Sequence, residues 1–224
     1  MLLSFSGGKD STLALYYALR RGYKITYLLT TVTEGYERVS IHGVRRELLK
    51  EQSGSLGIPL YEVFIPPSCT NAEYERRMGE AMRDLSGKDP DRVVIFGDIF
   101  LEDVRRYREE RLMRGGWKGM FPLWGRDTGE LAREFMALGF KAVVVSVDGE
   151  HLTGDFVGRE YDTSFLKDLP PEVDPCGENG EFHTFVYDGP IFSRPIRFSL
   201  GERVVRDGRF HYVDIVPSGS DGTG

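Results

Sequence analysis

The sequence lacks the features that define several protein classes. Its two cysteines, Cys69 and Cys176, form no C-x-x-C pair, so neither a zinc ribbon nor a dithiol site is indicated. No apolar run approaches the roughly 18 residues of a membrane-spanning helix. The net charge of −6 offers no global attraction to nucleic acid or anionic membranes. Because an apolar strand is expected from residue 2 and the thiols are scattered, we expect a cytoplasmic protein without a secretory leader.

Strand and helix patterns alternate through the first two-thirds of the chain. Strands are expected at 2–5, 25–32, 60–65, 92–96 and 141–147, and helices at 12–19, 44–56, 71–85, 101–113 and 127–138. Asn71 is the expected N-cap of its helix. Repeated β–α units predict a doubly wound, mostly parallel α/β sheet covered by helices on both faces.

The pattern changes after Val147, where glycine and proline become dense. A short helix is expected at 162–169, followed by strands at 182–187, 196–200, 203–205 and 210–216, with a hairpin turn at 206–209. We therefore predict one α/β domain at 1–147, a small α+β lobe at 148–217 and a flexible tail at 218–224.

A glycine-rich turn near the start is the clearest candidate site. It lies between the strand at 2–5 and the helix at 12–19, where free backbone N–H groups and the positive helix end bind anions. Two adjacent glycines allow close approach of a phosphate, and the lysine adds positive charge. The spacing is not that of a Walker A loop. We predict that the loop binds nucleotide phosphates through Ser6, Gly7, Gly8, Lys9, Asp10 and Ser11.

A second candidate follows the strand at 92–96. In an open parallel sheet, ligands bind beyond the carboxyl ends of strands where the strand order reverses. If the first and fourth predicted strands are neighbours, Gly97 would leave room for the nucleotide. Asp98, like Asp10, could hold Mg²⁺, and it could instead bind a ribose hydroxyl. A simple strand-ending Gly-Asp turn is the alternative.

The densest polar cluster lies at residues 175–186. Its glycine-spaced Glu178, Glu181 and His183 are costly to order unless something binds there. Side chains alternate along a strand, so Glu181 and His183 should share one face. The two glutamates could hold Mg²⁺ or an amine, and His183 could move a proton near neutral pH. An exposed polar turn is the competing interpretation.

Four motifs occur in a fixed order along the chain and together carry a specific resemblance. They are S-G-G-K-D-S, F-G-D-I, P-L-W at 122–124 and G-E-N-G-E-F-H-T-F-V. Over about residues 2–195 they resemble the diphthine–ammonia ligase family, a branch of the PP-loop (N-type) ATP pyrophosphatases. The resemblance implies that residues 1–147 form an ATP-binding PP-loop domain that is HUP-like, of the adenine nucleotide alpha hydrolase type, and that residues 148–217 form a family-specific substrate lobe. The implied activity is amidation of diphthine on translation elongation factor 2, with ATP, Mg²⁺ and ammonia, releasing AMP and pyrophosphate.

The resemblance also assigns roles within that reaction. It implies that Lys9 and Asp10 act with Glu178, Glu181 and His183 in catalysis, and that Asp10 and Asp98 bind the metal. Because the phosphate loop and the 175–186 cluster fall in different predicted domains, mutations should separate ATP binding from amidation.

Other interpretations stay open. A PP-loop enzyme that modifies tRNA is the enzymatic alternative, although the negative charge and isolated cysteines disfavour it. An ATP-binding sensor without turnover is the alternative from another class. A homodimer is one assembly that the chain could form. His42, Arg105, Trp117 and Trp124 are weaker candidates for the cleft, and Cys176 has no evident positive neighbour that would make it a nucleophile.

Overall fold

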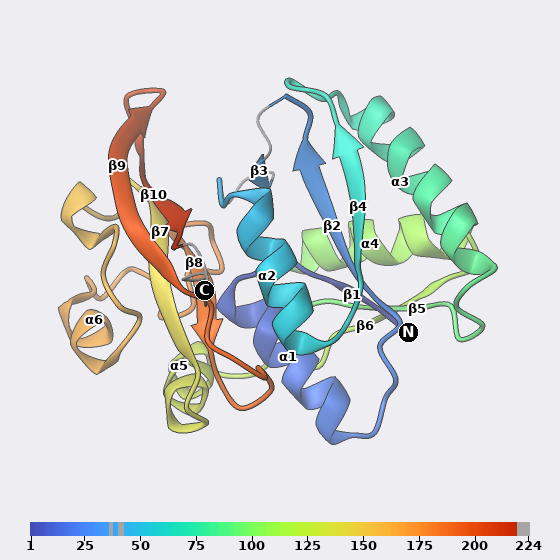
Figure 1. Ribbon diagram of the computed structural model, residues 1–224, viewed down its shortest axis with the longest axis horizontal. Coiled ribbons are helices and arrows are strands. Elements are labelled where there is room, and N and C mark those ends of the chain that lie inside the picture. Colours follow the sequence, from blue (N-terminus) through green and yellow to red (C-terminus); the bar gives the residue numbers. More distant parts are fainter. Residues whose placement is uncertain (36–37, 40–42, 219–224) are drawn as a thin grey trace, which may run out of the picture. The chain divides into compact units, whose positions relative to one another are not determined.

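The computed structural model describes residues 1–35, 38–39 and 43–218 (Figure 1). His42 and residues 219–224 of the predicted tail lie outside the described residues. The chain divides into two compact units. The first unit comprises Met1–Ser6, Asp10–Ser40 and Ile58–Arg126, and the second comprises Gly7–Lys9, Ile41–Gly57 and Asp127–Gly224.

The first unit has the predicted α/β architecture. Its elements are β1 (Leu2–Ser4), α1 (Lys9–Arg20), β2 (Tyr27–Thr33), β3 (Arg38–Val39), β4 (Leu60–Ile65), α3 (Asn71–Ser86), β5 (Val93–Ile95), α4 (Glu102–Arg114) and β6 (Lys118–Met120). Strands pair in parallel in the order β4-β2-β1-β5-β6, and β3 runs antiparallel to the end of β2. β1 and β5, the first and fourth predicted strands, are indeed neighbours. The fold class is confirmed.

Both faces of this parallel sheet are buried. On one face the strands pack against α3, which runs alongside β4 in Figure 1. The core residues of this face are Leu2, Leu29, Val63, Ile65, Ala81, Met82, Leu85, Val94, Phe96 and Trp117. Leu3, Leu28 and Ile95 occupy alternate positions and are fully buried as well. Burial on both faces explains why these strands are almost continuously apolar.

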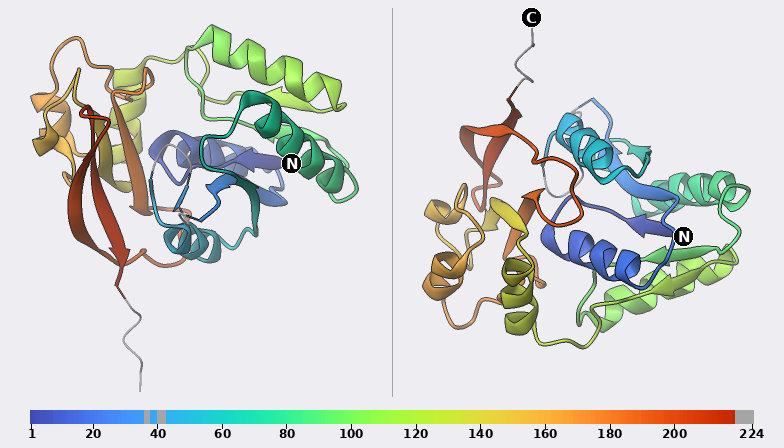
Figure 2. Two further views of the ribbon diagram at one scale, coloured as in Figure 1. Left: turned by 90° about the horizontal axis from the view of Figure 1, so that it is seen from above. Right: turned by 60° about the horizontal axis from the view of Figure 1, so that its bottom comes forward.

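The second unit is built on an antiparallel sheet. Its elements are α2 (Arg46–Leu56), α5 (Thr128–Ala137), β7 (Lys141–Asp148), the 3-10 turn η1 (Gly154–Phe156), α6 (Thr163–Asp168), β8 (Phe182–Asp188), β9 (Phe198–Arg206) and β10 (Phe210–Pro217). The strand order is β8-β7-β10-β9, and the long β9–β10 hairpin stands out in Figures 1 and 2. Within the described chain, no helix has the length and apolar composition needed to cross a membrane.

The strand at 141–147 corrects the sequence prediction. We expected it in the parallel sheet, but β7 pairs antiparallel with β8 and β10. After its first residue every position of β7 is buried, a pattern that fits a central strand of either kind of sheet. Its partners come from residues 182–217, so local sequence could not identify them. The compact units accordingly group β7 and α5 with the second unit, whereas the predicted boundary at 147 assigns both to the first domain.

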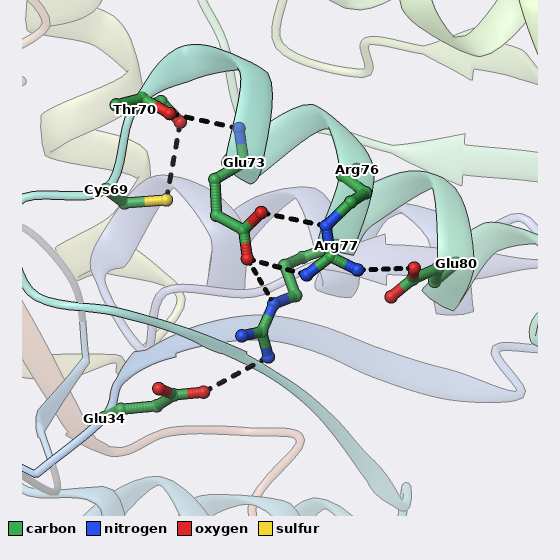
Figure 3. Close-up of polar contacts among 7 residues, drawn as sticks. All are labelled: Glu34, Cys69, Thr70, Glu73, Arg76, Arg77 and Glu80. Atoms are coloured by element: carbon green, nitrogen blue, oxygen red, sulfur yellow. Dashed lines mark hydrogen bonds and ion pairs between the residues drawn. The ribbon is translucent and has the colours of Figure 1, made fainter.

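The structure also corrects two sequence predictions about where helices and strands begin and end. Thr70, rather than Asn71, caps α3, since its hydroxyl accepts a bond from the Glu73 N–H at 3.3 Å (Figure 3). In the same figure the Glu73 carboxylate contacts Arg76 and Arg77, whose hydrogen bonds lower its pKa to about 2. The strands predicted at 196–200 and 203–205 form one strand, β9.

The predicted hairpin turn at 206–209 is confirmed. Asp207 and Gly208 have left-handed φ values of 53° and 65°, the Arg209 N–H donates to the Arg206 carbonyl at 3.0 Å, and Arg206 pairs with Phe210 across the hairpin.

Candidate functional site

The glycine-rich loop joins β1 to α1 as predicted, although α1 begins earlier, at Lys9. Gly7 has a φ of +80°, a left-handed conformation that glycine adopts without strain. Asp10 and Ser11 therefore lie in the first helical turn, where N–H groups point along the axis and the helix end is positive. In the first unit, the Ser6 and Ser11 hydroxyls lie 3.2 Å apart. This geometry is that of an anion-binding loop.

Strand β8 holds the middle of this loop. The Val186 N–H donates to the Gly7 carbonyl at 2.9 Å, and the Lys9 N–H donates to the Thr184 hydroxyl at 3.1 Å. β8 is an edge strand of its sheet, and these hydrogen bonds lie along the edge that faces away from β7. The loop and the 175–186 cluster are thus parts of one hydrogen-bonded structure. That mutations separate ATP binding from amidation stays a prediction.

The Lys9 side chain is buried in the second unit, with 4% of its surface exposed. Its ammonium donates to the Cys176 carbonyl. It also lies 5.4 Å from the centre of the Phe182 ring and 5.7 Å from that of Tyr161, within the range of cation–π attraction. The predicted phosphate-binding lysine is therefore oriented by the 175–186 cluster.

Glu181 anchors the turn that precedes β8. It is 2% exposed, and its Oε1 accepts from the Asp174 N–H at 3.1 Å and the Asn179 side-chain amide at 2.8 Å. Its Oε2 accepts from the Asn179 N–H at 3.0 Å. Asp174 in turn accepts from the backbone N–H groups of Cys176 and Glu178, at 3.1 and 2.9 Å. The carboxylate predicted to meet an amine thus organises the loop that carries Glu178.

His183 is neutral at physiological pH. Burial lowers its pKa to about 4, and the positive charge of Lys9 acts in the same direction, whereas Glu181 opposes them. This corrects the expectation of titration near neutrality, which rested on the pKa of an exposed imidazole. A neutral imidazole retains one ring nitrogen as a hydrogen-bond acceptor.

In the first unit, Gly97 allows the start of α1 to approach the end of β5. A Cβ atom at Gly97 would lie 2.7 Å from the Asp10 carbonyl carbon and 2.8 Å from the Ser11 nitrogen, closer than any side chain tolerates. The backbone of α1 fills the space on the Cβ side of Gly97, and a contact of Gly97 with the nucleotide stays a prediction. As the pairing of β1 with β5 predicts, the segments that carry Asp10 and Asp98 lie next to each other.

Asp98 forms an ion pair that the sequence did not indicate. Arg108 Nε lies 3.0 Å from Asp98 Oδ2 and 3.3 Å from Oδ1, and the Asp98 side chain is 12% exposed. The Arg108 guanidinium also stacks on Phe96, 4.6 Å from the ring centre. Ten residues separate the pair, a spacing that carries no local signal.

The weaker aromatic and arginine candidates have structural contacts. Arg105 stacks against Phe121 and Trp124, 4.8 and 4.6 Å from the ring centres. Trp117 is buried in the core of the first unit.

One further group has metal-ligand chemistry that the sequence analysis missed. Ligand atoms of Asp148, Glu150 and His151 lie within 4.8 Å of one another. Arg209 pairs with both carboxylates, and its hydrogen bonds lower the pKa of Asp148. Arg209 therefore already balances one of the two negative charges of this group.

The parallel sheet and the glycine-rich loop before α1 define an α/β protein with a strand–loop–helix candidate site for an anion. Family models described as the diphthamide synthase N-terminal and C-terminal domains match residues 1–118 and 127–215. The chain therefore belongs to the diphthamide synthase family, and this membership implies that it is an ATP-using enzyme of the ligase type.

Curated relatives agree with this assignment. A diphthine–ammonia ligase of Schizosaccharomyces pombe is 24% identical over 209 residues, which is 85% of this chain but 34% of the relative. The Rattus norvegicus diphthine–ammonia ligase is 27% identical over 227 residues, 89% of this chain and 83% of the relative. Among solved structures, a chain described as a predicted subunit of tRNA methyltransferase from Methanocaldococcus jannaschii has a TM-score of 0.42 and 17% identity, covering 65% of this chain and 78% of that one.

Proposed function

We propose that this protein joins ammonia to a carboxylate with the help of ATP, releasing AMP and pyrophosphate. The proposed acceptor is diphthine on translation elongation factor 2. The observation that carries the proposal is that Lys9 of the phosphate loop is bonded into the family-specific 175–186 cluster. Names of the relatives support the choice of diphthine and ammonia.

The first step is activation of the carboxylate. One of its oxygens attacks the α-phosphorus, the bond to the oxygen that bridges to the β-phosphate breaks, and pyrophosphate leaves with the bonding electrons. Lys9, the Gly7–Gly8 loop and the positive end of α1 would stabilise the charge that grows on pyrophosphate. For this the Lys9 ammonium must exchange the Cys176 carbonyl for a phosphate oxygen.

The carboxylates of Asp10 and Asp98 are of the ligand type that a magnesium ion prefers. Magnesium prefers carboxylate and phosphate oxygens, and these carboxylates come from adjoining loops of the first unit. When bound, the ion would neutralise charge on the triphosphate. Asp98 would then give up part of its ion pair with Arg108.

The second step is displacement of AMP. The ammonia lone pair attacks the acyl carbon, the C–O bond to AMP breaks, and one proton leaves the nitrogen. We assign receipt of the amine and its proton to Glu178 and His183: the Glu178 carboxylate can take the proton, and the neutral His183 ring can accept a hydrogen bond from the amine. Glu181 has a positioning role here, since it holds the loop that carries Glu178.

Product analysis tests this proposal. The wild-type protein, Mg²⁺, ATP, ammonia and diphthine-bearing elongation factor 2 should yield AMP, pyrophosphate and an amidated factor detectable by mass spectrometry. Lys9→Ala should lower the rate by roughly 100-fold or more, because it removes a charge from the phosphates. Formation of ADP and phosphate would contradict the chemistry. Bound but uncleaved ATP would favour the sensor, and normal diphthamide in a deletion strain would exclude this acceptor.

A further inference from the structure

A buried glutamine of α2 contacts the phosphate loop and β8 together. Gln52 is fully buried in the second unit. Its Nε2 donates to the Gly7 carbonyl at 2.9 Å and to the Val186 carbonyl at 2.6 Å. The Val186 N–H donates to the same Gly7 carbonyl at 2.9 Å. The Gly7 oxygen is therefore held by two donors from separate segments.

The orientation of the Gln52 amide is fixed by these contacts. Its NH₂ group faces two carbonyl oxygens, and a flipped amide would place an oxygen against both. Gln52 Oε1 is buried and has no hydrogen-bond partner among the described residues. Burying an unsatisfied oxygen costs stability, whereas an apolar side chain of similar length would avoid that cost. What the glutamine provides, and an apolar side chain of that length would not, is a pair of N–H donors for the Gly7 and Val186 carbonyls.

Gly7 and Gln52 fit each other closely. A Cβ atom at Gly7 would lie 2.6 Å from Gln52 Oε1 and 3.1 Å from Leu49 Cδ1, so only glycine leaves space for the amide. The planar trans peptide between Gly7 and Gly8 directs the Gly7 carbonyl and the Gly8 N–H in opposite directions. Holding the Gly7 carbonyl toward α2 and β8 thus also fixes the direction of the Gly8 N–H.

We propose that Gln52 is a positioning residue that sets the Gly7–Gly8 peptide plane so that the loop presents its N–H donors to the β- and γ-phosphates of ATP. The inference rests on the proposed function for the identity of the nucleotide. It predicts that Gln52 contributes to binding of the phosphate chain and not to binding of the adenosine part.

Calorimetric titration with ATP and with AMP tests this role. Gln52→Met keeps the side-chain length and removes both donors, so ATP affinity should fall by about tenfold while AMP affinity stays within about twofold. The matched control is Ser55→Ala on the same helix, which removes a buried hydroxyl that donates to the Arg194 carbonyl at 2.6 Å. This control should lower the melting temperature without changing the ratio of ATP to AMP affinity.

Each outcome decides the proposal. If Gln52→Met keeps the wild-type ratio of ATP to AMP affinity, for instance because it loses affinity for both nucleotides equally, the positioning role is contradicted. The proposed function is unaffected by that result as long as the wild-type protein binds ATP. A wild-type protein that binds no ATP overturns both. If Gln52→Met does not fold, Gln52→Glu tests the same bonds, because a protonated carboxyl retains a single donor. Its affinity ratio should then drop several-fold, and a wild-type ratio contradicts the proposal.

Discussion

Two glycine-containing acidic loops, one in each unit, hold their carboxylates in different ways. In the first unit, Asp98 is paired with the side chain of Arg108. In the second unit, Glu181 accepts three hydrogen bonds from donors within its own turn, two of them backbone N–H groups. In sequence both loops offer carboxylates that could hold Mg²⁺.

The difference lies in what a ligand would have to displace. A guanidinium on a long side chain can rotate away, so Asp98 can exchange its partner for a cation. The backbone donors around Glu181 cannot leave without unfolding the turn that positions Glu178 and Cys176. A buried carboxylate that is saturated by fixed donors is therefore a structural anchor, whatever its neighbours in sequence.

The largest expected effect comes from the two glutamates of the second unit. Glu181→Ala should lower the free energy of unfolding by about 2–4 kcal/mol, because three buried donors lose their acceptor. Glu178→Ala should change it by less than about 0.5 kcal/mol and act on product formation instead. Thermal unfolding beside an AMP-release assay separates the two. Similar melting temperatures for both variants would show that Glu181 is not the anchor.

A smaller effect is expected on the pH dependence of folding stability, and it comes from His183. The folded pKa of about 4 lies below the value of 6.5 for an unperturbed imidazole, so folding favours the neutral form. Its contribution to stability is full above pH 6.5 and is lost as pH falls toward 4. That loss amounts to about 2–3 kcal/mol once partial exposure to solvent is allowed for.

Denaturant unfolding of wild type and His183→Asn between pH 8 and 4 would measure this contribution. The difference between the two proteins should shrink by that amount across the interval. NMR titration provides the direct check. A His183 pKa near 6.5 would mean that the ring is solvated and that Lys9 does not act on it.

The smallest effect is expected at Cys176. Lys9 contacts the carbonyl of this residue and not its thiol, and the thiol donates to the Thr128 carbonyl at 3.3 Å. A serine hydroxyl can make the same bond, so Cys176→Ser should keep AMP formation within a few-fold of wild type, as measured by chromatography of the nucleotides. A loss as large as that of Lys9→Ala would make the thiol catalytic and revive a sulfur-transfer reaction.

Sequence alone was sufficient for the features that depend on local pattern. The strand–glycine loop–helix at the start, the alternating elements of the first unit and the left-handed hairpin at Asp207–Gly208 all follow from periodicity and turn chemistry. The ordered motifs were sufficient to suggest the family, which the matches over 1–118 and 127–215 confirm.

Only the tertiary structure decided the pairing of distant segments. An evenly apolar β7 could have joined either sheet, and its antiparallel partners lie far along the chain. The bonds of Gln52 to Gly7 and Val186, and of Lys9 to Cys176, span between 45 and 167 positions. The residue types determine which atoms can donate or accept a hydrogen bond. The fold determines which of these atoms come into contact in a buried, low-dielectric environment. That setting lowers the pKa of His183 and surrounds Glu181, one of the predicted catalytic residues, with three hydrogen-bond donors.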